Sequence, residues 1–280
     1  MALSLTIAVV LLVFIVFFIN SRAASAKETH FWSPPPNWAL GTPSQIIIIR
    51  HGEKLCNVTS DQITRMQANP LYNPNNLAPA DFVKYINNTW ENQMTCDGYA
   101  RGVCMGNKLV SSKMIPDYVF ACIPSNNGGG ASARSLLLAQ MIVSEIQRQT
   151  RIKVPLNVVS YTRDYWQFLI DSLTQPEFRG KRILIVWEHD VINKKIIPYI
   201  FDVDPATTEK TIKYTPIANS EFDVLINVNF AGGKPALTES RQNCTAVPAA
   251  VSTFNANYPA QAQSCKQYGP SDNIGKCSTL

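Results

Sequence analysis

The fold is decided by the stretch Gln45-Ile46-Ile47-Ile48-Ile49-Arg50-His51-Gly52. Four successive isoleucines show no helical period, and β-branched side chains pack well on a pleated surface. Residues 45–49 are therefore predicted to form a strand that is buried on both faces. The strand leads directly into a charged arginine and a titratable histidine. Ligands of open α/β sheets bind at the carboxyl ends of the strands, so the same stretch predicts a functional edge.

The rest of the chain alternates short apolar runs with segments of helical period. Such alternation is typical of a mainly parallel sheet covered on both faces. The predicted fold class is therefore α/β, a three-layer α/β/α sandwich with a mainly parallel central sheet. The predicted strands cover residues 45–49, 117–122, 156–160, 182–187 and 222–229, and the predicted helices cover residues 79–90, 98–114, 132–148, 165–172 and 191–201.

The 280-residue chain opens with an apolar segment, residues 2–19, that contains no charged side chain. Residues 1–26 are interpreted as a signal peptide or a signal anchor, and both alternatives stay open. Ala24-Ser25-Ala26 offers a small-x-small cleavage site, whereas the apolar segment has the length needed to span a bilayer core. In either case we expect the rest of the chain outside the cytosol, secreted or anchored to the membrane.

Three further regions follow this leader. Residues 27–44 carry prolines among polar residues and are predicted to form a linker. Residues 45–230 have the length and pattern of one α/β domain. Residues 231–280 are rich in Ala, Ser, Pro and Gln and contain three of the seven cysteines, so they are predicted to form a loosely structured C-terminal tail.

The cysteines and glycosylation sequons indicate the compartment in which the protein is located, and the net charge indicates which partners it binds. Three Asn-x-Ser/Thr sequons, at Asn57, Asn87 and Asn243, are expected glycosylation sites in a secretory lumen. The seven cysteines contain no C-x-x-C pair, so no metal site is predicted, and two or three disulfides are expected in an oxidising compartment. The formal net charge of +5 is spread along the chain, without the dense basic face that nucleic-acid binding needs.

Two of the three histidines follow predicted buried strands. His30 lies in the linker, whereas His51 follows residues 45–49 and His189 follows residues 182–187. A single histidine in such a place is more often a hydrogen-bonded structural residue. Two at separate strand ends, each beside charged residues, indicate a shared site. A neutral imidazole is a good nucleophile near neutral pH and can accept a phosphoryl group.

The charged residues near these histidines fit phosphoryl transfer. Phosphoryl oxygens need arginine partners, and Arg50 precedes His51 while Arg134 lies at the start of the helix that follows a Gly-rich loop. A leaving oxygen needs a proton, and Glu188 and Asp190 flank the second histidine. Alternation along an extended segment predicts that only one of these two carboxyl groups faces the site.

Taken in order, these segments resemble the histidine phosphatase superfamily, which includes phosphoglycerate-mutase-like and histidine acid phosphatase-like proteins. The resemblance covers roughly residues 45–230. It depends on Arg50-His51-Gly52-Glu53-Lys54 after the first strand, on Gly98-Tyr99-Ala100-Arg101-Gly102, on Ser125 with Ala133-Arg134-Ser135, and on Trp187-Glu188-His189-Asp190. The triplet alone is a weak signal, but its place after the isoleucines and its three companion segments make the resemblance specific.

The resemblance implies a phosphohistidine mechanism. His51 would be the nucleophile, and Arg50, Arg134 and His189 would form the phosphate pocket. Lys54 stands near the place of a further arginine that acid phosphatases carry after the triplet, and it could contact phosphate as a point charge rather than as a planar fork.

The general acid depends on the branch of the superfamily. In the acid-phosphatase branch it is the aspartate directly after the second histidine, which corresponds to Asp190. In the mutase branch it comes from a segment between the central helix and the last motif, and Glu188 and Asp164 are then the candidates.

The expected function is hydrolysis of a phosphomonoester through a phosphohistidine intermediate on His51, outside the cytosol. The expected partner is a small phosphorylated substrate, without a cofactor or nucleic acid, and residues 2–19 could anchor the chain to a membrane. The alternative is a catalytically weak or inactive phosphatase-fold protein that binds a phosphorylated ligand or a protein partner. The presence of both histidines and both arginines favours catalysis.

Overall fold

The computed structural model describes residues 36–38, 41–52, 94, 96–122, 134–157, 163–244 and 256–259, all within one compact unit, Pro36–Leu280. Several predictions fall outside these ranges, namely the leader of residues 1–26, most of the linker, the helix at residues 79–90, Lys54, Asn57 and Asn87. In the described ranges, no helix is both long and apolar enough to cross a membrane.

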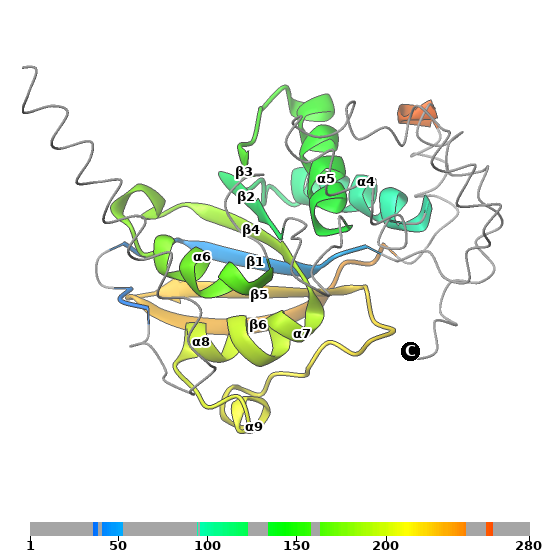
Figure 1. Ribbon diagram of the computed structural model, residues 1–280. Coiled ribbons are helices and arrows are strands. Elements are labelled where there is room, and N and C mark those ends of the chain that lie inside the picture. The colour runs from blue at the N-terminus through cyan, green and yellow to red at the C-terminus, as the bar shows by residue number, and fades with distance from the viewer. Residues whose placement is uncertain are drawn as a thin grey trace, which may run out of the picture. The chain divides into compact units, whose positions relative to one another are not determined.

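A six-stranded mixed sheet forms the centre of the described part of the chain, with the strand order β3-β2-β4-β1-β5-β6 (Figure 1). Strands β1, β4, β2 and β3 pair in parallel, whereas β5 is antiparallel to β1 and β6 is antiparallel to β5. The predicted α/β class is confirmed. The strands are β1 (Gln45–Arg50), β2 (Tyr118–Ala121), β3 (Leu156–Asn157), β4 (Arg182–Trp187), β5 (Val224–Ala231) and β6 (Lys234–Arg241).

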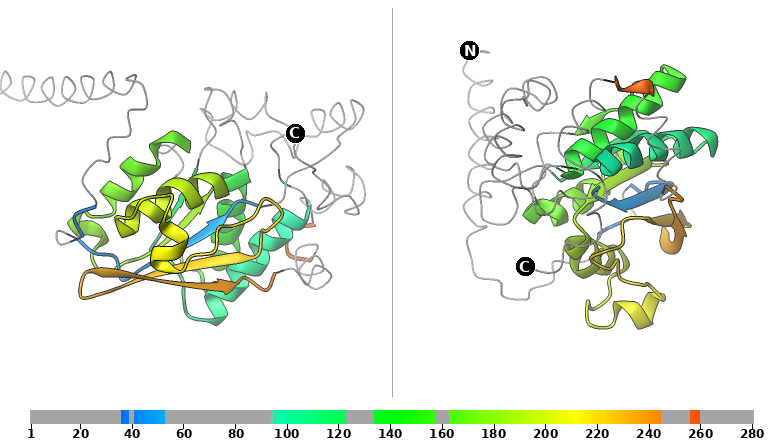
Figure 2. Two further views of the ribbon diagram at one scale, coloured as in Figure 1. Left: turned by 90° about the horizontal axis from the view of Figure 1, so that it is seen from below. Right: turned by 90° about the vertical axis from the view of Figure 1, so that its right-hand side faces the viewer.

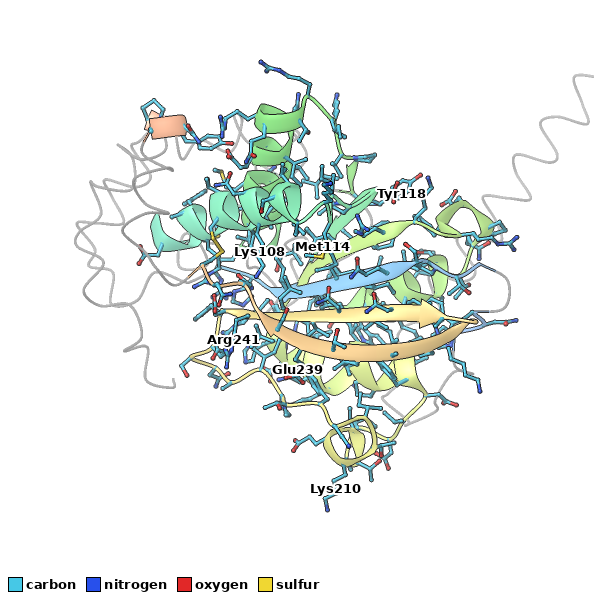
Figure 3. All side chains as sticks on the ribbon, turned by 180° about the vertical axis from the view of Figure 1, so that it is seen from behind. Lys108, Met114, Tyr118, Lys210, Glu239 and Arg241 are labelled. Carbon is cyan, nitrogen blue, oxygen red and sulfur yellow. A yellow bond between two sulfur atoms is a disulfide. The ribbon has the colours of Figure 1, made fainter. Side chains whose placement is uncertain are left out.

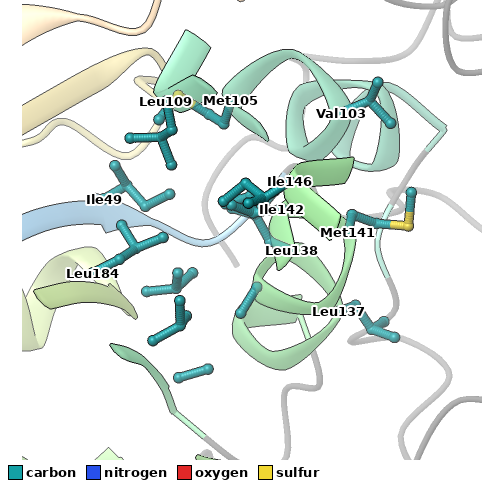
Figure 4. Packing of buried hydrophobic residues seen from close by; sticks show 14 of the residues in the cluster. Ile49, Val103, Met105, Leu109, Leu137, Leu138, Met141, Ile142, Ile146 and Leu184 are labelled. Carbon is teal, nitrogen blue, oxygen red and sulfur yellow. The ribbon is translucent and has the colours of Figure 1, made fainter. Parts of the chain in front are cut away.

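One face of the sheet packs against α4 (Cys96–Ser111) and α5 (Arg134–Thr150). Ile47 and Ile49 of β1 point to this layer and are fully buried, together with apolar side chains from both helices (Figure 4). The two helices approach closely at Gly102, where an added Cβ would lie 2.5 Å from the Cβ of Met141. Gly102, which ends the Gly98–Gly102 motif, therefore allows α4 and α5 to pack closely.

The opposite face packs against α6 (Trp166–Ser172) and α8 (Ile197–Phe201) (Figure 2). Ile46 and Ile48 point to this second layer and are fully buried as well. Because side chains alternate along a strand, four consecutive isoleucines supply apolar contacts to both layers at once. The predicted three-layer arrangement is present.

The remaining helical segments are short. The predicted helix of residues 191–201 begins earlier than expected, at His189, and contains a π-turn before α8. These segments are the 3₁₀ turns Arg163–Tyr165 and Pro176–Phe178, α7 (His189–Val191), the π-turn Ile192–Ile196 and α9 (Thr208–Ile212).

Strand β6 corrects the prediction of a loosely structured tail from residue 231 onward. Gly232 and Gly233 have φ angles of 62° and 79°, so the chain reverses there and residues 234–241 pair with β5. The strand has little apolar content because most of its side chains are exposed, and its sequence therefore lacks the pattern of a buried strand. Its end lies beside α4, where Lys108 donates to the carbonyl of Arg241 at 2.6 Å (Figure 3).

Two buried contacts join α4 to the chain around β5 and β6. Cys104 and Cys244 form a disulfide across 140 residues, and a disulfide of long separation typically stabilises a domain by about 2–5 kcal/mol. Arg101 donates to Asp223 and to Gln242, each at 3.2 Å. The arginine of the Gly98–Gly102 motif therefore connects α4 to the chain around β5 and β6, and residues 232–244 are part of the folded domain.

Candidate active site

His51 lies immediately after β1, beside the end of β4. Its backbone N–H donates to the carbonyl of Trp187 at 3.0 Å, and its side chain is only 2% exposed. Nδ1 lies 2.8 Å from the carbonyl oxygen of Gly52. Because a carbonyl only accepts, Nδ1 carries the proton, and in the neutral ring Nε2 keeps its lone pair.

The surroundings of His51 favour its neutral form. Burial lowers its pKa well below the ordinary value of 6.5, and the charges of Arg134 and Arg50 lower it further. The hydrogen bond to Gly52 acts in the opposite direction but does not reverse the shift. At neutral pH the ring is therefore uncharged, within a positively charged environment.

Arg50 is fixed by the loop that precedes β5. Its Nη1 donates to the carbonyls of Ala218, Asn219 and Glu221 at 2.9, 2.7 and 3.0 Å. Its guanidinium carbon also lies 3.9 Å from the ring centre of Phe222, a cation–π contact. The side chain is 5% exposed, so its charge is placed in the interior next to His51.

Arg134 is the first residue of α5, where the free N–H groups of a helix favour an anion. Burial lowers its pKa to about 10, and the negative charge of Glu188 acts against that effect. The guanidinium therefore stays charged at neutral pH. Its charge lowers the pKa of both His51 and His189, which places all three side chains in one electrostatic environment.

His189 leaves β4 at the edge where His51 leaves β1. The two strands pair in parallel, with Arg50 opposite Trp187, so the residues that follow them are neighbours. Nε2 of His189 contacts Oδ1 of Asn219. Burial and the nearby Arg50 lower the pKa of this second ring too. The expected nucleophile, His51, and the three residues expected in the phosphate pocket thus come together, and their individual roles remain predictions.

The two carboxyl groups that flank His189 lie in different surroundings. Glu188 is 12% exposed and pairs with Arg163 at 2.8 Å, and burial raises its pKa despite the opposing charges of Arg163 and Arg134. Asp190 is 46% exposed and pairs with Lys194 at 3.1 Å. Burial acts to raise the pKa of Asp190, but the hydrogen bond from Lys194 and the nearby His189 leave it below its ordinary value.

Sequence reasoning missed three residues of this region: Arg163, Asn219 and Phe222. Arg163 lies in a 3₁₀ turn before α6, whereas Asn219 lies in a turn and Phe222 in the coil before β5. None of them follows a strand or belongs to a recognisable motif, so no sequence signal identifies them. Asp164, the third carboxyl candidate, lies next to Arg163, and its charge acts on the pKa of Glu188.

Of the other predicted site residues, only Asn243 lies within the described ranges. Asn243 is exposed, and its N–H donates to Asp223 at 3.3 Å, while its glycosylation stays a prediction. Lys54, Asn57, Asn87 and the Gly-rich loop before Arg134 lie outside the described ranges. Among the described residues, no group of three or more His, Cys, Asp or Glu side chains could bind a metal ion.

Comparison with known proteins gives distant structural neighbours only. No protein-family model and no curated protein sequence matches the chain. A protein assigned as the phosphohistidine phosphatase SixA of Agrobacterium tumefaciens matches with a TM-score of 0.39 and 11% identity, over 67% of this chain and 92% of that one. A histidine-to-alanine variant of phosphoserine phosphatase from Entamoeba histolytica, bound to phosphoserine, matches with a TM-score of 0.39 and 14% identity, over 71% and 97%.

A third neighbour is a protein assigned as an α-ribazole-5'-phosphate phosphatase of Escherichia coli, with a TM-score of 0.40 and 12% identity, over 70% of this chain and 96% of that one. These three phosphatases belong to the superfamily that the sequence resembles. At these identities and TM-scores the likeness assigns no reaction to this chain.

Proposed function

We propose that this protein hydrolyses phosphomonoesters of small molecules through a phosphohistidine intermediate on His51, outside the cytosol. One observation carries the proposal. A buried, neutral imidazole with its Nδ1 proton bound to a carbonyl lies in the electrostatic field of two arginines at a sheet edge. Such a site attracts an anion and supplies a lone pair to attack it.

In the first step, Nε2 of His51 attacks phosphorus and the ester oxygen leaves on the opposite side. Arg50, Arg134 and His189 stabilise the charge on the three equatorial oxygens. The leaving oxygen takes a proton from a carboxylic acid, which gives a free alcohol and phosphorylated His51. In the second step, water loses a proton to that carboxylate and attacks phosphorus, so the Nε2–P bond breaks and inorganic phosphate leaves.

We assign the general acid to Glu188. Asp190 is the candidate by resemblance to acid phosphatases, but it is half exposed and has a pKa below its ordinary value. Glu188 is mostly buried, and its pKa lies above the ordinary value of 4.5. A group with a raised pKa keeps its proton over a wider pH range, as a general acid must.

The proposal predicts a bell-shaped pH profile of kcat/KM. His51 is a nucleophile only when it is unprotonated, so activity rises as pH passes its lowered pKa, well below 6.5. Glu188 is an acid only when it is protonated, so activity falls as pH passes its raised pKa, above 4.5. Glu188→Gln should remove the falling limb and slow esters of poor leaving groups by about 10²–10⁴-fold.

Asp190→Asn is the matched control for that measurement. It changes the carboxyl group that follows His189 in the sequence, whereas Glu188→Gln changes the one that precedes it. We expect it to slow esters of good and poor leaving groups alike, and by much less. If Asp190→Asn or Asp164→Asn gives the selective loss instead, the acid is that residue and the assignment of Glu188 is wrong.

The activity itself is tested with the full chain, an aryl phosphate and substrate labelled in the phosphoryl group. Rapid quenching should trap one acid-labile phosphoryl group per active chain, since phosphohistidine is stable to base and labile to acid. An acid-stable adduct would assign the nucleophile to another residue type. Binding of inorganic phosphate without any turnover would favour the alternative of an inactive phosphatase-fold protein.

The location outside the cytosol is supported by the apolar residues 2–19 and by the Cys104–Cys244 disulfide, since disulfides are rare in the cytosol. Protein isolated from the cells that make it should contain this disulfide in oxidised form. N-terminal sequencing should give a start at Lys27 for a cleaved signal, or intact residues 1–26 in the membrane fraction for an anchor. A cytosolic chain with both thiols reduced would contradict the proposed location.

A further inference from the structure

The loop that precedes β5 contacts two basic groups of the site, Arg50 and His189. The carbonyls of Ala218, Asn219 and Glu221 accept from Arg50, and the side chain of Asn219 accepts from Nε2 of His189. The same short segment therefore sets the position of an arginine from β1 and of a histidine from the end of β4.

The contact with Asn219 determines where the proton of His189 lies. Because an amide oxygen only accepts, Nε2 is the protonated nitrogen. The nearest oxygen of Asp190 is 3.7 Å from the same nitrogen, which is too far for a hydrogen bond. Nδ1 is buried and has no hydrogen-bond partner among the described residues. A buried polar atom without a hydrogen-bond partner destabilises the fold, so it is expected where a ligand completes the contact.

The loop is itself attached to the π-turn that follows His189. Asn193, in the π-turn Ile192–Ile196, donates from Nδ2 to the carbonyl of Ile217 at 3.0 Å and accepts from the N–H of Ile217 at 3.0 Å. Its Oδ1 also accepts from the hydroxyl of Tyr214. Both backbone groups of the residue just before Ala218 are thereby satisfied by one side-chain amide. π-turns are frequent at functional sites, and this one connects His189 to its own hydrogen-bond acceptor.

We propose that Asn219 is a positioning residue: it fixes His189 as the Nε2–H tautomer, so that Nδ1 is the atom presented to the phosphoryl group, and Asn193 fixes Asn219 through Ile217. The two histidines of the site are then opposite tautomers. His51 is protonated on Nδ1, through Gly52, and attacks with Nε2, whereas His189 is protonated on Nε2 and contacts phosphate with Nδ1. The role of phosphate in this inference rests on the proposed function, but the tautomers do not.

The charges that face His189 explain why an explicit partner is needed. Arg50 from β1 and Arg134 from α5 disfavour its protonated form, whereas Asp190 from α7 favours it. The ring is therefore neutral in the free protein at neutral pH, and a neutral imidazole can exist as either tautomer. When a phosphate dianion binds, its charge favours protonation of Nδ1, which then donates to a phosphate oxygen.

The inference is tested by ¹⁵N NMR of the imidazole rings, which is tractable because the chain has only three histidines. The free wild-type protein should show His51 as the Nδ1–H tautomer and His189 as the Nε2–H tautomer. In Asn219→Leu, the signals of His189 should change to a mixture of tautomers, while those of His51 stay the same. A wild-type His189 that is protonated on Nδ1 would overturn the proposal, even if Asn219→Leu failed to fold.

Asn219→Asp is the conservative variant. It keeps the acceptor oxygen, so His189 should keep its Nε2–H tautomer, and the titration midpoint of His189 should move to higher pH because a carboxylate stabilises the imidazolium. Asn227→Leu is the matched control, since Asn227 lies on β5 and accepts from Gln45 at 3.1 Å, on another part of the sheet. It should leave both histidine spectra unchanged.

Kinetics provide a second readout. Loss of the outer partner of an oriented histidine typically costs 10- to 100-fold, so we expect roughly that decrease in kcat/KM for Asn219→Leu and a much smaller one for Asn219→Asp and Asn227→Leu. Equal tautomers and equal rates for Asn219→Leu and Asn227→Leu would overturn the positioning role. Opposite tautomers that depend on Asn219, in a protein that hydrolyses no phosphomonoester, would support the positioning role and overturn only the proposed hydrolase.

Discussion

Replacing His51 by alanine is expected to lower the rate of aryl phosphate hydrolysis by a factor on the order of 10⁴ or more. In the proposed mechanism the change removes the atom to which the phosphoryl group bonds, and removal of a covalent nucleophile leaves only the contribution of the binding groups. The loss should appear in kcat, with substrate binding retained, because Arg50, Arg134 and His189 are unchanged. Steady-state kinetics across acidic to neutral pH measure it.

The same variant should lose the acid-labile phosphoryl label. His30→Ala is the matched control, since it removes a histidine from the predicted linker and should keep both the rate and the label. His51 is buried, so circular dichroism and thermal unfolding must first show that the variant is folded. A folded His51→Ala protein with the rate of His30→Ala would show that the proposed nucleophile is wrong.

Arg134→Ala should lower kcat by about 10²–10³-fold, the usual effect of removing one preorganised charge from a transition state. The guanidinium at the start of α5 lies near both histidines and stays charged at neutral pH, so it neutralises charge on the phosphoryl oxygens as they move toward His51. Arg134→Lys should recover only part of the loss, because an ammonium group cannot bind two oxygens in one plane.

Arg151→Ala is the matched control for this variant. It removes one positive charge at an exposed position just after the other end of α5, and it should change the rate by less than a factor of about 2. Inhibition by inorganic phosphate gives an independent measurement, since Arg134→Ala should weaken it and Arg151→Ala should not. If both variants lose activity equally, the effect comes from net charge, and the local role of Arg134 is contradicted.

The central part of the fold could be predicted because its sequence signal is local. The isoleucines of β1 and the run Arg182–Trp187 of β4 are apolar without a helical period, which occurs when both faces of a strand are covered. The position of His51 and His189 follows from the same signal, since a polar residue directly after such a run has to lie at the edge of the sheet. Arg134 could be predicted at the same edge because it lies at the start of the helix that follows β2.

The rest of the site could not be predicted, because its residues are selected by contacts between distant segments. Asn219 lies in a turn and Arg163 in a 3₁₀ turn, and they reach the site only through the packing of neighbouring elements. The environments of Glu188 and Asp190 also differ only in three dimensions, although the two residues are separated by a single position. Strand β6 was missed for a related reason, since an exposed edge strand needs no apolar pattern.

The position of β1 in the sheet has a consequence for the synthesis and folding of the protein. β1 is the first strand of the sheet to be made, but Gln45 pairs with Arg182, 137 residues later, and with Asn229 on its other side. At about 5–20 residues per second, synthesis of the intervening chain takes on the order of 10 s. During that interval four adjacent isoleucines have no strand to pair with, which is a segment prone to aggregation. A chaperone or the translocation machinery that covers residues 45–49 would therefore increase the yield of active protein more than one that acts on any later strand.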